Sequence, residues 1–160
     1  MKEIKITTSL TVFSDISALP DHIEELMKQA IQIREQAYAP YSNFFVGAAI
    51  LLENQKVVLG NNQENACYPS GLCAERTAIF NAGANYPGVK IEAIAISARS
   101  KQYQVRKPVP PCGSCRQAIS EYEHKQATAI PIYFMGEAGE VYVSGSLSNL
   151  LPFTFDNTYL

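Results

Sequence analysis

The sequence predicts a three-layer α/β/α domain in which helices cover both faces of a β-sheet. Apolar, β-branched stretches alternate with helical patterns in the order α-β-β-α-β-α-β-β-α. The 160 residues suffice for one core, and 47% hydrophobic against 18% charged residues is a typical globular balance. Because no repeat or low-complexity linker divides the chain, we expect a single domain.

The N-terminal part is expected to hold an arm and the first helix. Residues 1–20 are interpreted as an arm or short extra strand, because Glu3–Phe13 partly alternates apolar and polar residues. A loosely ordered tail is the open alternative. The single folded domain is then expected over 21–160. Its first helix should span 21–38, with Asp21 and Glu24 forming a capping box and Pro40 ending it.

The remaining elements follow from runs of apolar residues and from loop residues between them. A hairpin, two helices, three further strands and a closing helical turn in "SLSNLLPFTF" are expected. Gly83 is expected to end the second helix. In chain order the elements are strands Phe44–Leu52 and Lys56–Gly60, a helix from Cys73, strand Val89–Ala98, a helix from Cys112 toward Tyr122, and strands within "IPIYFMG" and "VYVSG".

Charge and hydropathy narrow the classes of partner. The net charge is -2 and no basic stripe is present, so we expect no nucleic-acid partner. The N-terminus does not resemble a signal peptide, and no apolar run approaches the roughly 20 residues that span a bilayer. We therefore expect a cytoplasmic protein without a membrane partner. In that reducing compartment the four cysteines favour metal binding or catalysis over disulfides.

Three cysteines are placed as ligands of a catalytic metal. Cys112 and Cys115 form C-x-x-C, a spacing used by metal sites and also by redox dithiols. Cys73 and Cys112 each open an expected helix, where free N–H groups favour thiolate. Three protein ligands leave one zinc position for water, the catalytic arrangement. A closed structural site with Cys67 or a histidine as fourth ligand is the alternative.

Two charged side chains next to Cys73 complete the expected chemistry. Three thiolates and a hydroxide around Zn²⁺ sum to -2, so a nearby cation is needed, and Arg76 or Arg116 can donate to sulfur. Glu75 can share the pocket with Cys73 only at the tip of the helix. There it can act as general base and then as general acid.

These motifs resemble a known enzyme signature. C-A-E at 73–75 and P-C-x-x-C at 111–115 resemble the zinc nucleoside deaminases, and the cysteine in first position resembles the small cytidine deaminases. The resemblance covers about Tyr38 to Phe155. It implies a mixed five-stranded sheet, one Zn²⁺ per subunit and a homotetramer with shared active sites. The implied reaction is hydrolytic deamination of cytidine and deoxycytidine to uridine and deoxyuridine in pyrimidine salvage. A blasticidin-type nucleoside or another aminated base is the alternative substrate.

The resemblance also implies roles for single residues. Phe44 would stack on the pyrimidine, and Val46 would line its pocket. Asn62 and Glu64 would bind the sugar hydroxyls, and Tyr68 would lie near the sugar. The main chain at Ala74 and Pro111 would contact the base or the leaving ammonia. Gln117 would brace the metal shell, and Phe155 would reach into a neighbouring subunit's site. The arm before Asp21 is longer than is usual in this family.

Overall fold

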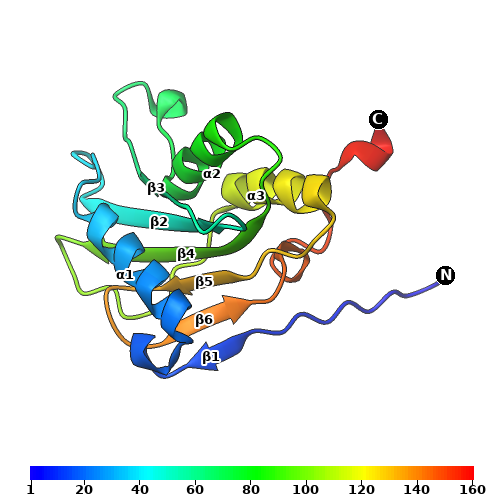
Figure 1. Cartoon of the computed structure of the whole chain (residues 1–160), viewed down its shortest axis with the longest axis horizontal. Coiled ribbons are helices and arrows are strands. Elements are labelled where there is room, and N and C mark those ends of the chain that lie inside the picture. The colour runs from blue at the N-terminus through cyan, green and yellow to red at the C-terminus, as the bar shows by residue number, and fades with distance from the viewer.

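Six strands form one mixed sheet between two helical layers in the computed structural model, which describes residues 1–160 (Figure 1). The strand order is β1-β6-β5-β4-β2-β3. The strands are β1 (Thr11–Phe13), β2 (Phe44–Leu52), β3 (Val57–Asn61), β4 (Ile91–Ser100), β5 (Ile132–Met135) and β6 (Val141–Ser144). The helices are α1 (Asp21–Arg34), α2 (Ala74–Asn85) and α3 (Gly113–Gln126).

The pairing of the strands confirms a mixed sheet. β4 and β5 run parallel, whereas all other neighbouring strands are antiparallel. The expected count of five strands is wrong by one, because β1 adds an edge strand to β6. The parallel β4–β5 pair needs a crossover connection, and α3 lies in it.

Each face of the sheet has its own core, because successive strand residues point to opposite faces. On one face, Ala48 and Ile50 of β2 pack with Ala78 and Ile79 of α2 and Ile119 of α3. On the other face, the apolar stripe of α1 covers β2 and β4. That second cluster includes Ile23, Leu26, Met27, Ala30, Ala49, Leu51, Ala93 and Ala95. Helices therefore cover both faces, as expected from the order of elements.

Two glycines allow the helices to approach the sheet closely. A Cβ on Gly60 of β3 would lie 2.6 Å from the Ala74 carbonyl oxygen and 2.5 Å from the Ala78 nitrogen. Gly47 of β2 likewise faces the backbone of α1 at Ala30 and Arg34. Because only glycine lacks a Cβ, Gly60 fixes how closely the first turn of α2 lies against the sheet.

The ends of α1 differ from the expectation. Pro20 is its N-cap, Asp21 is its first residue, and no side chain caps it. The prediction of a capping box formed by Asp21 and Glu24 is therefore wrong. The helix ends at Arg34 rather than near Tyr38. The Tyr38 N–H donates to the Asn62 carbonyl (3.0 Å), which pulls this part of the chain toward the loop after β3.

The ends of α2 and α3 also lie beyond the expected residues. α2 continues past Gly83 to Asn85. Gly83 is there because the Tyr122 hydroxyl of α3 occupies the space a Cβ would need, not because the helix ends. α3 continues past Tyr122 to Gln126 and ends with Ala127 in the left-handed region at φ 51°.

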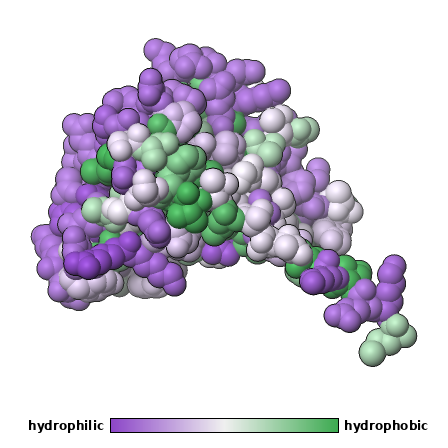
Figure 2. Space-filling view, turned by 90° about the horizontal axis from the view of Figure 1, so that it is seen from below, coloured by the Kyte–Doolittle hydropathy of each residue, from purple (hydrophilic) through white to green (hydrophobic).

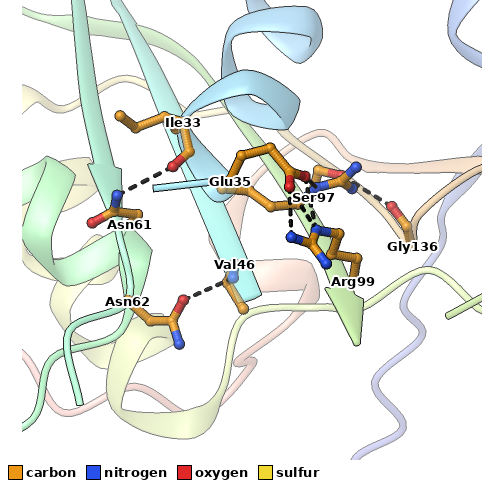
Figure 3. A network of polar contacts seen from close by, with 9 residues as sticks. Ile33, Glu35, Val46, Asn61, Asn62, Ser97, Arg99 and Gly136 are labelled. Atoms are coloured by element: carbon orange, nitrogen blue, oxygen red, sulfur yellow. Dashed lines mark hydrogen bonds and ion pairs between the residues drawn. The ribbon is translucent and has the colours of Figure 1, made fainter. Parts of the chain in front are cut away.

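A polar network joins the end of α1 to the sheet (Figure 3). The guanidinium of Arg34, which is 5% exposed, donates to the Ser97 hydroxyl (2.7 Å), and Ser97 donates to the Gly136 carbonyl (3.0 Å). Glu35 accepts from both Arg34 (3.1 Å) and Arg99 (2.8 Å). Satisfying a buried guanidinium in this way avoids a large desolvation penalty. None of the helices has the length and apolar character needed to span a membrane.

Candidate active site

Three cysteine thiols meet where the N-termini of α2 and α3 converge. Cys73 is the N-cap of α2, Cys112 is the N-cap of α3, and Cys115 is the third residue of α3. The Cys73 and Cys112 sulfurs lie 3.8 Å apart, and those of Cys112 and Cys115 lie 3.5 Å apart. All three sulfurs lie within 4.8 Å of one another. The fold therefore brings together thiols from two helix N-termini that lie about forty positions apart in sequence.

The spacing of the sulfurs fits a tetrahedral zinc ion. A Zn–S bond of about 2.3 Å in a tetrahedral site places neighbouring sulfurs about 3.8 Å apart. The measured separations of 3.5 and 3.8 Å agree with that edge. Cys67 is exposed and lies outside the cluster, so it does not supply a fourth ligand. Both histidines are exposed and also lie outside it. The cluster therefore has three protein ligands and one open position.

The cluster stabilises negative charge on one of its sulfurs, that of Cys73. A hydrogen bond from the Cys115 thiol, together with the Arg76 guanidinium, lowers the pKa of Cys73 to about 5. The same contact with Cys73, together with burial, raises the pKa of Cys115. Nη2 of Arg76 lies 3.8 Å from the Cys73 sulfur. Nε of the same guanidinium is buried and donates to no acceptor in the chain.

Glu75 lies in the first turn of α2 and is 6% exposed. Burial raises the pKa of its carboxyl group to about 7, and the negative charge on Cys73 acts in the same direction. A carboxyl group with a pKa near 7 can both accept and donate a proton at neutral pH.

Arg116 and Gln117 contact the backbone of other loops rather than the sulfurs. Arg116 donates to the carbonyls of Pro111 (2.8 Å) and Leu150 (2.7 Å). Gln117 donates to the Phe155 carbonyl (2.7 Å). The first five residues of α3 therefore tie the C-terminal segment to the loop that carries Cys112.

A pocket of about 790 Å³ opens beside Cys73. Its size lies in the usual range for a small-molecule site. Of the residues implied by the resemblance, Asn62, Glu64 and Tyr68 line this pocket. The full lining comprises Tyr41, Ser42, Asn62, Gln63, Glu64, Asn65, Ala66, Tyr68, Pro69, Gly71, Leu72, Cys73, Arg76 and Ser114.

Asn62 and Glu64 are held by the backbone on the pocket wall. The Asn62 side chain accepts from the Val46 N–H (2.8 Å; Figure 3) and donates to the Phe44 carbonyl (2.9 Å). Glu64 accepts from the N–H groups of Tyr41 (2.9 Å) and Ser42 (3.3 Å). Burial opposes ionisation of Glu64, but these hydrogen bonds outweigh it and lower the pKa of Glu64.

The other implied residues lie outside the lining of this pocket. Phe44 and Val46 are half-buried on β2, and Ala74 is fully buried in α2. Phe155 is 60% exposed in the C-terminal segment, where it stacks on Tyr159. Sequence reasoning missed Tyr41 and Ser42, which hold Glu64. The "APYSN" run at 39–43 contains residue types that favour turns and could have indicated a loop at the site. In the structure Asn43 takes the left-handed conformation of such a turn (φ 54°).

The family is decided by a match over residues 20–130, which fit the family described as "Cytidine and deoxycytidylate deaminase zinc-binding region". The chain belongs to this family. It is 42% identical over 130 residues to the cytidine deaminase of Halalkalibacterium halodurans, covering 81% of this chain and 91% of that protein. The cytidine deaminase of Sporosarcina psychrophila is 39% identical over 134 residues, covering 83% and 90%.

Solved structures of cytidine deaminases share the fold. The enzyme from Burkholderia pseudomallei superposes with a TM-score of 0.72 at 40% identity, over 86% of this chain and 100% of that chain. The enzyme from Mycobacterium tuberculosis gives 0.64 at 29% identity, over 84% and 97%. The protein is therefore a deaminase, a hydrolase, and its cofactor is the zinc ion of the family's zinc-binding region, which the cysteine cluster can hold.

Proposed function

We propose that this protein converts cytidine and deoxycytidine to uridine and deoxyuridine, with release of ammonia, in pyrimidine salvage. The observation that carries the proposal is the placement of Glu75. Its buried carboxyl group lies two residues from Cys73, at the tip of the helix whose first residues border the pocket. The relatives named cytidine deaminase support cytidine as the substrate.

The proposed division of roles follows from the positions of the side chains. Cys73, Cys112 and Cys115 would hold a zinc ion, which when bound lowers the pKa of a water molecule to near 7. Glu75 takes one proton from water and delivers it to N3 of cytosine, and the hydroxide that remains adds to the electrophilic C4. Glu75 then takes the proton of the new C4 hydroxyl group and passes it to the amino group. The C4–N bond breaks, ammonia leaves, and the water oxygen stays on C4 as the carbonyl oxygen.

The pocket favours a nucleoside over a nucleotide. We assign Asn62, Glu64 and Tyr68 to the sugar, and Phe44, Val46 and the main chain at Ala74 and Pro111 to the base. The pocket wall carries the Glu64 carboxylate, and its one arginine, Arg76, is directed at sulfur. A carboxylate accepts hydrogen bonds from sugar hydroxyls but repels a phosphate.

Assembly and location complete the proposal. We propose a homotetramer in which Phe155, exposed on its own chain, reaches a neighbouring subunit's site. A cytoplasmic location suits three thiols that must stay reduced. Sedimentation combined with an activity assay tests the assembly, and a fully active monomer would contradict it.

The decisive experiment compares zinc content and cytidine deamination, followed by absorbance, in the wild type and Glu75→Gln. The variant should bind one zinc per chain but lose at least about 100-fold in rate, the lower range for acid–base catalysis. Near-normal turnover would remove Glu75 from this role. Cys67→Ser is the matched control and should keep both zinc and activity.

A substrate panel separates the remaining alternatives. Cytidine, deoxycytidine, blasticidin S and adenosine should be compared on one preparation. Turnover of blasticidin S or adenosine in preference to the cytosine nucleosides would replace the proposed substrate while leaving the chemistry intact.

A further inference from the structure

The N-terminal arm, residues 1–10, lies outside every helix and strand of the chain. All ten residues are exposed, and the arm extends away from β1 (Figure 1). The family match begins only at residue 20, so the arm is not part of the matched deaminase region. The catalytic proposal leaves the arm without a role.

The arm has one apolar face and one polar face. In an extended chain successive side chains point to opposite sides. From position 4 to position 12 of β1, the even positions carry Ile4, Ile6, Leu10 and Val12, which are 76%, 45%, 43% and 51% exposed, with the polar Thr8 at their centre. Odd positions carry Lys5, Thr7, Ser9 and Thr11. This alternation is typical of a strand with one buried face, yet nothing in the chain covers it.

The arm continues an open edge of the sheet. β1 is the end strand, pairing with β6 on one side only through Thr11, Val12 and Phe13. Its other side is free for hydrogen bonding, and free edges are the places where a second strand adds. Figure 2 shows the arm projecting from the body of the molecule into open space. Leu10 and Val12 are exposed apolar residues where the arm meets the sheet edge.

We propose that residues 4–12 pair with the same residues of a second copy of this chain, antiparallel about a two-fold axis at Thr8. In this register Ile4 lies opposite Val12 of the second copy, Ile6 opposite Leu10, and Thr8 opposite Thr8. The polar face pairs Lys5 with Thr11. Apolar side chains therefore meet apolar ones, and the contact is self-complementary, as a two-fold interface requires.

The two-fold register is distinguished from its neighbours by the pattern of apolar and polar residues. If one copy slides by a single residue relative to the other, Ile6 lies opposite Thr11. Apolar side chains then face polar ones.

Single cysteines in a Cys67→Ser background of the zinc-loaded full chain test the register. Thr8→Cys places two thiols directly opposite each other, with Cβ atoms about 5 Å apart, within reach of a disulfide after small adjustment. Lys5→Cys, on the same arm, places them about 20 Å apart at about 3.3 Å per residue. We expect Thr8→Cys to form the intermolecular disulfide at least about tenfold faster than Lys5→Cys. Equal rates would overturn the proposal.

A pair of charge variants separates the apolar face from general repulsion. Adding Ile6→Lys and Leu10→Lys to Thr8→Cys should slow cross-linking at least about tenfold. The two-fold axis repeats the contact between Ile6 and Leu10, so the two lysines remove both copies of it. Thr7→Lys with Ser9→Lys adds the same charge on the opposite face and should slow it far less. Equal slowing by both pairs would contradict the proposed face. Because these variants lie outside the catalytic site, the result does not depend on the deaminase activity.

Discussion

At the residue scale, charge balance decides the chemistry of the cysteine cluster. Three thiols packed within 4.8 Å cannot all ionise unless positive charge is supplied. The Arg76 guanidinium lies on one side of the cluster, and a zinc ion would supply the remainder. Arg116, the other arginine considered from sequence, is instead committed to two carbonyls. The sequence left both arginines as candidates for this charge, because both closely follow a ligand cysteine.

Replacing Arg76 should weaken zinc binding. Arg76→Gln removes the cation next to Cys73, so ionising the thiols becomes harder and zinc affinity should fall about 10- to 100-fold. Competition with a chromophoric chelator at neutral pH measures this. Arg106→Gln changes an exposed arginine away from the cluster and should leave affinity unchanged. Equal affinities for wild type and Arg76→Gln would show that the guanidinium does not act on the thiols.

The Glu35 ion pair predicts a small pH dependence of stability (Figure 3). Hydrogen bonding from Arg99, helped by Arg34, lowers the pKa of Glu35 below its usual 4.5. A lowered carboxyl pKa stabilises the folded state above pH 4.5, and this contribution disappears as pH falls through the lowered pKa. Because the side chain is 47% exposed, Glu35→Gln should cost less than about 1 kcal/mol at pH 7. Urea titrations at pH 7 and pH 3 should show that difference shrinking; a constant difference would contradict it.

At the element scale, the active site depends on how closely α2 packs against β3. Gly60 lies against the Ala74 carbonyl and the Ala78 nitrogen, in the turn that carries Glu75. Moving this turn would displace Cys73 and Glu75 together. The packing of one helix thus sets both the metal ligand and the proton-transfer residue.

Gly60→Ala should therefore affect stability and activity together. The added methyl group has no room, so α2 must shift, at a cost of about 1–3 kcal/mol. Denaturant unfolding and deamination assays measure the two effects. Gly145→Ala is the matched control, because a Cβ there meets nothing within 4 Å, and it should change stability by less than about 0.5 kcal/mol. Normal stability and activity in Gly60→Ala would show that the helix position tolerates the change.

The starts of the site helices were predictable from sequence, whereas several ends and contacts were not. Cys73 and Cys112 follow loops and precede helix-forming runs, so both N-termini were found locally. Gly83 looked like a helix end because its role depends on Tyr122, which lies far along the chain. The contact of Gln117 with Phe155 depends on tertiary structure in the same way. Local patterns predict elements, but partners distant in sequence decide what each glycine or amide contacts.

At the scale of the whole molecule, the cysteine cluster connects parts of the chain that are distant in sequence. Cys73 belongs to the segment after the β2–β3 hairpin, whereas Cys112 and Cys115 follow β4. α2 and α3 pack on the same face of the sheet. A zinc ion held by all three thiols would link their N-termini through metal–sulfur bonds as well as through packing. Binding to the folded chain should then stabilise the whole domain.

Removing zinc should lower the melting temperature by about 10 °C. A ligand present at about 1,000 times its dissociation constant adds about 4 kcal/mol to the folded state, and 1 kcal/mol shifts a domain of this size by roughly 2–4 °C. Calorimetry with and without a chelator, followed by zinc addition, measures the loss and its recovery. Cys112→Ser should melt at one temperature with or without chelator, because a ligand is missing, whereas Cys67→Ser should respond like the wild type. A wild type that keeps its melting temperature without zinc would mean that packing alone holds the two helix starts together, with the metal serving only the chemistry.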